Sequence, residues 1–172
     1  MSRHDRRARC LTAVLAAAVS LLPVAATAQT PDHQAARAAV EHFLDVLGKR
    51  QLEALPALLD PKATMVVVRQ REGLWSHTVS TADEFVATLK AQPNPTTFTE
   101  PLTSVSVHVE DGQLAFVRAD FTVVIGGEVR SHGVDYFTLV KSGGAWKLLN
   151  GSYEPSRVSA QELFDMIDPQ GQ

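Results

Sequence analysis

The stretch HGVDYFTLVKSGGAWKLLNGSYE, residues 132–154, contains two runs of alternating apolar and polar side chains on either side of a Gly-Gly pair. Alternation with a period of two is typical of a half-buried strand, and a glycine pair between two such runs predicts a hairpin. Asp135 falls on the same predicted face as Phe137 and Leu139. A carboxylate at the edge of an apolar face is a catalytic acid or base, a ligand anchor, or half of a structural ion pair.

The rest of the chain places helices before this hairpin. A helical apolar stripe covers residues 34–50, a second short helix is predicted over 52–59, and a third over 81–91 begins with the capping box Thr81–Glu84. A strand pair around Gly73 lies between the second and third helices. From residue 98 onward, turn signals at 111–112, 126–127 and 143–144 predict a four-stranded meander. We therefore predict an α+β fold in which the helices cover one face of a curved antiparallel sheet.

The first 28 residues are typical of a secretory signal peptide. Four arginines precede an apolar run over 11–26, and Ala26 and Ala28 suit cleavage after Ala28. An uncleaved membrane anchor is the alternative, although the run is short for a span. We expect a periplasmic or secreted protein with one domain over 29–158 and a short helix or tail over 159–172. Cys10, the only cysteine, leaves with the signal peptide, so no disulfide is expected.

The charge balance excludes several classes of partner. The chain has 16 Lys and Arg against 19 Asp and Glu, and removal of residues 1–28 leaves 12 against 18. No basic run remains, so nucleic acid is not an expected partner. No second apolar stretch is long enough to span a membrane. The histidines are scattered without ligand spacing, and no phosphate loop or nucleophile elbow is present, so neither a metal nor a cofactor is predicted.

The turns predict which side chains share a face. If each turn has two residues, Arg118 lies opposite Asp135, Phe116 opposite Phe137, and Asp135 opposite Ser152. The resulting face is apolar and becomes polar at one end, which is typical of a small-molecule site. Its apolar members are Val105, Val107, Val109, Leu114, Phe116, Phe137, Leu139, Trp146 and Leu148, and its polar members are Thr103, Arg118, Asp120, Asp135, Asn150 and Ser152.

Asp135 is the candidate catalytic residue of this face. An apolar environment raises the pKa of a carboxyl group and suits it for general base catalysis, whereas an opposed Arg118 lowers that pKa and makes a structural ion pair. Trp75 and His77 are placed near the mouth of the pocket. The predicted ligand-binding set is Arg118, Asp120, Asn150, Ser152, Trp75, His77, Phe116, Phe137 and Trp146.

The opposite face carries apolar residues among polar ones. Phe121, Tyr136 and Tyr153 are among its predicted apolar members, and His108 and Lys147 are among its polar ones. An exposed patch of this kind suggests a partner surface, so a homodimer that packs through the outer face of the sheet is expected. A fold-back of the C-terminal segment is the alternative.

The order of these segments resembles the nuclear transport factor 2-like superfamily and, within it, the SnoaL-like subgroup. The resemblance rests on an N-terminal helix, on FLDVLGKRQLEALPALLDPKATMVVV, and on strands that end in YFTLVKSGGAWKLLNGSYE, and it covers roughly residues 35–155. It implies a cone-shaped fold around a pocket and frequent dimerisation. Because the superfamily has no invariant catalytic signature, the fold does not give the function.

Three functions remain open from the sequence. The first is non-catalytic binding of a small, mostly apolar molecule in a conical pocket. The second is a lyase or isomerase that uses Asp135 as a base, helped by Arg118, Asn150 or Ser152. The third is a dimeric interaction module whose pocket is incidental.

Overall fold

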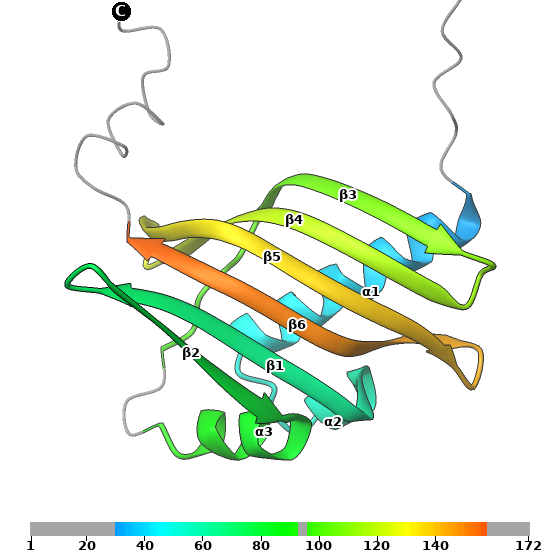
Figure 1. Cartoon of the computed structure of the whole chain (residues 1–172), viewed down its shortest axis with the longest axis horizontal. Helices are drawn as coiled ribbons and strands as arrows, with labels where there is room; N and C mark the ends of the chain where they lie inside the picture. The colour runs from blue at the N-terminus through cyan, green and yellow to red at the C-terminus, as the bar shows by residue number, and fades with distance from the viewer. Residues whose placement is uncertain (1–29, 93–95, 158–172) are drawn as a thin grey trace, which may run out of the picture.

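The computed structural model of the protein describes residues 30–92 and 96–157 of the 172-residue chain (Figure 1). The expected signal peptide, 1–28, and the expected C-terminal helix or tail, 159–172, lie outside these residues. No helix within the described ranges has both the length and the apolar character needed to cross a bilayer.

Three helices precede the main part of the sheet. In α1 (Pro31–Gly48), an apolar stripe that includes Ala36, Val40 and Phe43 is buried against the sheet. The short α2 (Leu55–Leu58) forms a single turn. The capping box at the start of α3 (Ala82–Lys90) is confirmed, because the Thr81 and Glu84 side chains each bond the backbone of the other. These bonds lower the pKa of Glu84.

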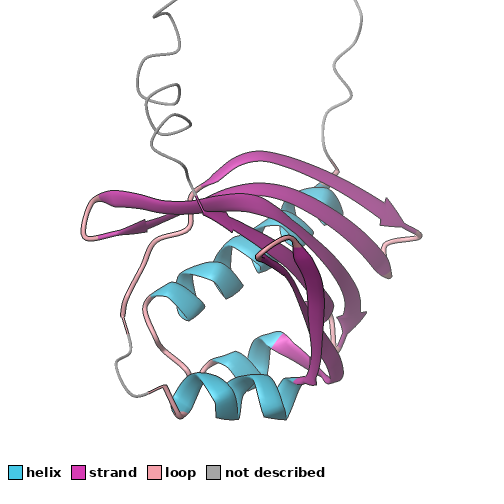
Figure 2. Cartoon of the chain, turned by 60° about the vertical axis from the view of Figure 1, so that its left-hand side comes forward, coloured by secondary structure: helices cyan, strands magenta, loops and turns pink. Residues whose placement is uncertain are grey.

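Six strands form one curved sheet that wraps around α1 (Figures 1 and 2). Their order is β2-β1-β6-β5-β4-β3, and all neighbours are antiparallel except β1 and β6, which run parallel. This arrangement confirms the predicted α+β fold. The strands are β1 (Leu59–Arg71), β2 (Leu74–Thr81), β3 (Leu102–Glu110), β4 (Leu114–Ile125), β5 (Glu128–Ser142) and β6 (Ala145–Arg157).

The predicted register is wrong by one residue over most of the meander. The β3–β4 connection is a three-residue loop, because Glu110 pairs with Leu114. The β4–β5 hairpin has the expected two-residue turn, but β5 carries an extra residue at position 130. In β6 the extra residue is at position 149, after the correctly predicted Leu139–Leu148 pair. Each shift of register is caused by one extra residue, in a loop or in a β-bulge. A shift of one residue moves the following side chains to the other face of the sheet.

These shifts exchange the faces of several predicted site residues. On β4, Val117 is 2% exposed and faces the helices, whereas its neighbour Phe116 is 46% exposed on the outer face. Ala119 and not Arg118 lies opposite Asp135. On β6, Tyr153 and not Ser152 lies opposite Asp135. Phe121 and Tyr153 therefore belong to the inner face, contrary to the prediction.

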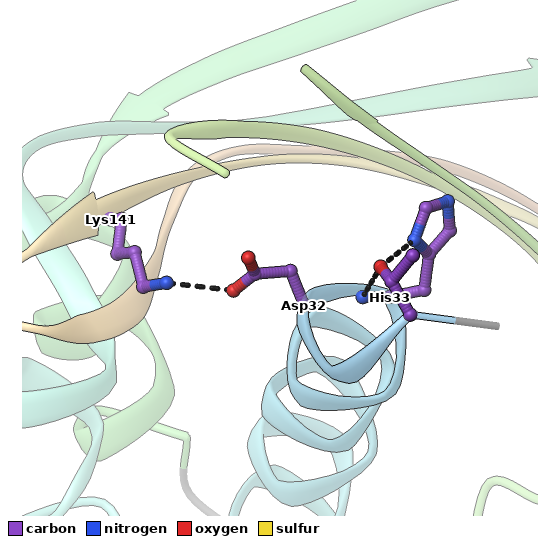
Figure 3. A network of polar contacts seen from close by, with 4 residues as sticks. Asp32, His33 and Lys141 are labelled. Atoms are coloured by element: carbon purple, nitrogen blue, oxygen red, sulfur yellow. Dashed lines mark hydrogen bonds and ion pairs between the residues drawn. The ribbon is translucent and has the colours of Figure 1, made fainter. Parts of the chain in front are cut away.

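A partly buried ion pair connects the N-terminal end of α1 to the sheet. Lys141 donates from Nζ to Asp32 Oδ1 at 2.7 Å (Figure 3). The same ammonium group lies 5.5 Å from the centre of the Trp146 ring, which is buried. In the same figure, the hydroxyl of the N-cap residue Thr30 contacts the His33 side chain and accepts from its backbone N–H. Trp146 is therefore a core residue of this end of the molecule.

Candidate functional site

A cavity of about 490 Å³ lies between the inner face of the sheet, α1, α3 and the segment that leads into β3. This volume is in the range of sites for small organic molecules. Arg50 supplies a cation to its lining, and Asp135 and Glu100 supply carboxyl groups. The remaining lining is largely apolar and includes six aromatic side chains: Phe43, Phe85, Phe98, Phe121, Phe137 and Tyr153.

Asp135 lies in the middle of β5, between Ala119 of β4 and Tyr153 of β6. Its side chain is on the inner face, and the residue is only 3% exposed. The Asp135 Oδ2 atom is buried and has no hydrogen-bond partner among the described residues. An unsatisfied buried carboxyl oxygen is costly, which makes this atom a candidate contact for a ligand.

Glu100 reaches the same place from a segment without regular structure. Thr99 forms two backbone hydrogen bonds with Val124 of β4, of 3.0 and 2.9 Å. On the other side of Glu100, the Pro101 carbonyl accepts from the Thr122 N–H at 3.2 Å. The segment is thus fixed to β4 both before and after Glu100. These bonds hold the half-buried Glu100 carboxyl group at the cavity, next to Asp135.

A second attachment fixes the same segment to α1. The Phe98 N–H donates to the Gly48 carbonyl at 3.0 Å, and the two backbones approach so closely that a Cβ on Gly48 would overlap the Phe98 carbonyl. Gly48 is the last residue of α1. A glycine at this helix end therefore allows the close approach that brings Phe98 and Glu100 to the cavity.

The two carboxyl groups form a hydrogen-bonded pair with raised pKa values. Burial is the largest cause for both, and it raises the pKa of Asp135 to about 9 and that of Glu100 to about 7. The negative charge of Glu100 and the hydrogen bond to it raise the pKa of Asp135 further. Burial also raises the pKa of Tyr153. Near neutral pH the carboxyl pair therefore retains at least one proton, which the two groups share.

Arg50, which lines the same cavity, is held by bonds to other residues. Its backbone is left-handed, with φ of 60°. The guanidinium group donates to the Leu89 carbonyl and to Gln92 Oε1, both at 2.6 Å. No cation is among the groups that shift the pKa of Asp135 or Glu100. Arg50 thus links α1 to the end of α3 and does not neutralise the carboxyl pair.

Of the predicted site residues, the cavity contains Asp135 and Phe137. The expected Arg118–Asp135 pair does not form, because Arg118 lies on the outer face. There it bonds Asp120, with 2.8 Å between Nη2 and Oδ1. Phe116 is on the same outer face, and Trp146 is in the core. The outer-face positions of Arg118 and Phe116 follow from the register shifts, whereas Trp146 packs at the end of the sheet where Lys141 bonds Asp32.

The other predicted polar residues also lie outside the cavity. Ser152 donates to Asn150 Oδ1 at 2.8 Å, and Asn150 donates to Thr64 Oγ1 at 3.0 Å, which links β6 to β1. Trp75 and His77 are exposed on β2, the edge strand next to β1, and neither lines the cavity.

Sequence reasoning missed Glu100 and placed Tyr153 on the wrong face. Glu100 lies in the segment 96–101, TTFTEP, which has no periodic pattern from which a burial could be predicted. Tyr153 was assigned by strict alternation from Leu148, and the extra residue at position 149 reverses that assignment. Only the close spacing of Phe98 and Glu100 before a strand could have suggested that this segment is buried.

Chemically, the pair can accept or donate a proton, and it can also bind a ligand group directly. A carboxyl group that retains its proton at neutral pH donates a hydrogen bond, and its partner carboxylate accepts one. The surrounding rings provide an apolar environment, in which each such contact is stronger than in water.

Comparison with known proteins agrees with this architecture. Residues 31–154 match the model of a protein family described as "Putative lumazine-binding". The comparison with curated proteins gives no match.

Solved structures with the same fold include three bacterial proteins, all between 15% and 16% identical to this chain. One is the beta subunit of a "putative aromatic-ring-hydroxylating dioxygenase" from Novosphingobium aromaticivorans, with a TM-score of 0.57 over 74% of this chain and 92% of that one. A "Putative Scytalone Dehydratase" from the same organism has a TM-score of 0.56 over 72% and 83%. An "ntf2-like protein of unknown function" from Shewanella baltica has 0.55 over 74% and 95%. At these identities the similarity shows the fold alone, which is nuclear transport factor 2-like.

Proposed function

The chain belongs to the family described as "Putative lumazine-binding", and from this premise we propose that it binds a small, mostly apolar molecule in the cavity beside Asp135. The observation that carries the proposal is the combination of an aromatic lining with a buried carboxyl oxygen that has no partner. A lining of this kind contributes affinity through apolar contact, and a few polar groups fix the orientation of the ligand. The family description makes a flat heterocycle such as lumazine a reasonable first probe.

Two neighbouring valines provide a matched test of the cavity. Val123 lines the cavity, whereas Val124, the next residue of β4, does not. We expect lumazine to bind the wild-type protein in a fluorescence titration, Val123→Trp to weaken this binding at least tenfold, and Val124→Trp to leave it within about twofold. Native mass spectrometry of the protein from its own host would identify a co-purified molecule. Equal loss of binding in both variants would contradict the assignment of the cavity.

A lyase or isomerase reaction is the second candidate, and the raised pKa of Asp135 is the observation that favours it. A carboxyl group with such a pKa is protonated at neutral pH. To act as a base, Asp135 would first pass its proton to Glu100 and then accept one from the ligand. Arg118, Asn150 and Ser152 cannot assist, because they lie on the outer face. Deuterium exchange into a bound ligand that disappears in Asp135→Asn would support this candidate; exchange that persists in the variant would exclude Asp135 as the base.

Two further proposals concern the setting of the site. We propose that residues 1–28 direct the chain to the periplasm or the outside of the cell. The change in mass expected for cleavage after Ala28, measured on protein from the native host, tests this.

We also propose that two copies associate through the outer face of the sheet, where Phe116 is 46% and Tyr136 55% exposed.

A further inference from the structure

We propose that the cavity selects an organic cation, an amine or quaternary ammonium group on an apolar body, with its charged nitrogen against the carboxyl groups of Glu100 and Asp135. This inference rests on the proposed function, because it specifies the ligand class of the same cavity. It goes further in stating which charge the ligand carries and which two side chains recognise it.

These two acids lack a positive partner among the described residues. Several other carboxylates in the described part of the chain have cationic partners: Lys141 bonds Asp32, and Arg118 bonds Asp120. Asp135 and Glu100 have no such partner within the described residues, although they are the two carboxyl groups that line the cavity. Buried charges are normally paired, so the pair retains protons while the cavity is empty.

One oxygen of Asp135 is also left without a hydrogen-bond partner in the described part of the chain. Asp135 is 97% buried, its Oδ2 atom has no hydrogen-bond partner, and the residue lines the cavity. The N–H of a protonated amine would satisfy it by a hydrogen bond, and any cation, a quaternary ammonium group included, would compensate the charge that appears when the pair loses its proton.

The aromatic lining of the cavity also favours a cation. Phe43 lies at the centre of a ring cluster, with its centroid 6.1 Å from that of Phe137 and 6.5 Å from that of Phe85. Aromatic faces attract cations, and this attraction is larger in a desolvated site than in water. Rings combined with carboxylates are thus suited to an organic cation. An anion would be repelled by the same carboxyl groups once they lose a proton.

The other charged or titratable groups near the pair do not oppose a cation. Arg50 is bound to Leu89 and Gln92, and its charge does not shift the pKa of either acid. Tyr153 has a raised pKa and is neutral at physiological pH. Arg69 acts on Tyr153 and is not among the groups that shift the pKa of the acids. Asp135 and Glu100 therefore decide how ligand binding depends on pH.

The alternative ligand is a neutral molecule whose carbonyl oxygen accepts a hydrogen bond from the protonated pair. The two ligand classes have opposite pH dependence. A cation binds better as the pair loses its protons, so its affinity rises with pH. A carbonyl acceptor needs the carboxyl proton, so its affinity falls with pH.

The experiment compares two molecules of the same shape that differ in charge. Phenyltrimethylammonium and tert-butylbenzene differ at one atom, a charged nitrogen in place of carbon, and neither titrates. By calorimetry at pH 8 we expect the cation to bind at least tenfold more tightly than the hydrocarbon, and at pH 5 we expect this advantage to fall below threefold. Glu100→Gln and Asp135→Asn should each remove most of the advantage at pH 8.

Each outcome has a defined meaning. Equal affinities at pH 8, or an advantage of the cation that does not change with pH, would overturn the selection of a cation while the cavity remains a small-molecule site. Binding of neither molecule at millimolar concentration would contradict the proposed function itself. Because the comparison of pH 5 with pH 8 uses the wild-type protein, the test remains decisive if either variant does not fold.

Discussion

At the scale of single residues, Asp135 and Glu100 connect stability to pH. Because burial raises both pKa values above those of the unfolded chain, the folded protein holds protons that the unfolded chain releases above about pH 4. The stability contributed by these protons is complete below that pH. It is lost as the pH rises through the folded pKa of Glu100, near 7, and then that of Asp135, near 9. We expect the Tm of the wild-type protein to fall by at least about 5 °C between pH 5 and pH 8, measured by circular dichroism.

Replacement of the buried acid by its neutral isostere should reduce this dependence. Asp135→Asn keeps the shape of the side chain and cannot ionise, so the variant should lose less stability between pH 5 and pH 8 than the wild type. Asp120→Asn is the matched control, because Asp120 is an outer-face aspartate paired with Arg118. A wild-type Tm that is the same at both pH values, or an equal effect of both substitutions, would show that the buried pair does not store protons.

At the scale of elements, the segment 96–101 is positioned by its contact with α1, and Gly48→Ala tests that contact. In a helix without tertiary contacts this substitution is stabilising by up to about 1 kcal/mol. Here the added Cβ would overlap the Phe98 carbonyl, so we expect a destabilisation of roughly 1–3 kcal/mol in urea denaturation. The displaced segment should carry Glu100 away from the cavity, which would reduce the fall of Tm between pH 5 and pH 8. Stabilisation by Gly48→Ala would contradict this account of the segment.

The elements themselves could be predicted from the sequence, whereas their exact register could not. The apolar stripe of α1, the capping box at Thr81 and the three turn signals all depend on local chemistry, and the structure contains each of them. The extra residues at positions 130 and 149 have no comparable marker. Both faces of β4 contain apolar side chains, so alternation allows either register. Bulges bend a sheet around what it covers, and this long-range requirement decides the register.

The site, too, could be predicted only in part, because its composition depends on the register of the strands. Asp135 was singled out because a carboxylate interrupts an apolar face, and this reasoning depends on its own strand alone. The residues that contact the Asp135 side chain depend on the relative positions of three strands and of a segment without regular structure. The sequence therefore indicated the unusual acid, but not Glu100 or Tyr153.

At the scale of the whole molecule, the helices cover the inner face of the sheet and leave its outer face open (Figure 2). Phe116 and Tyr136 are large exposed side chains on that outer face, one on β4 and the other on β5. Burial of two aromatic side chains against a second copy would remove them from water, which is the main favourable contribution to association.

We therefore expect the wild-type protein to have the mass of a dimer by light scattering at about 20 µM, and the double variant Phe116→Glu, Tyr136→Glu to be a folded monomer. Ala35→Glu, on the exposed side of α1, is the control and should remain a dimer. Because the cavity lies on the other face of the sheet, the monomeric variant should bind lumazine as the wild type does. A monomeric wild type would contradict association through this face. A monomer that loses ligand binding would show instead that the second copy helps to hold the curved sheet, and with it the carboxyl pair, in place.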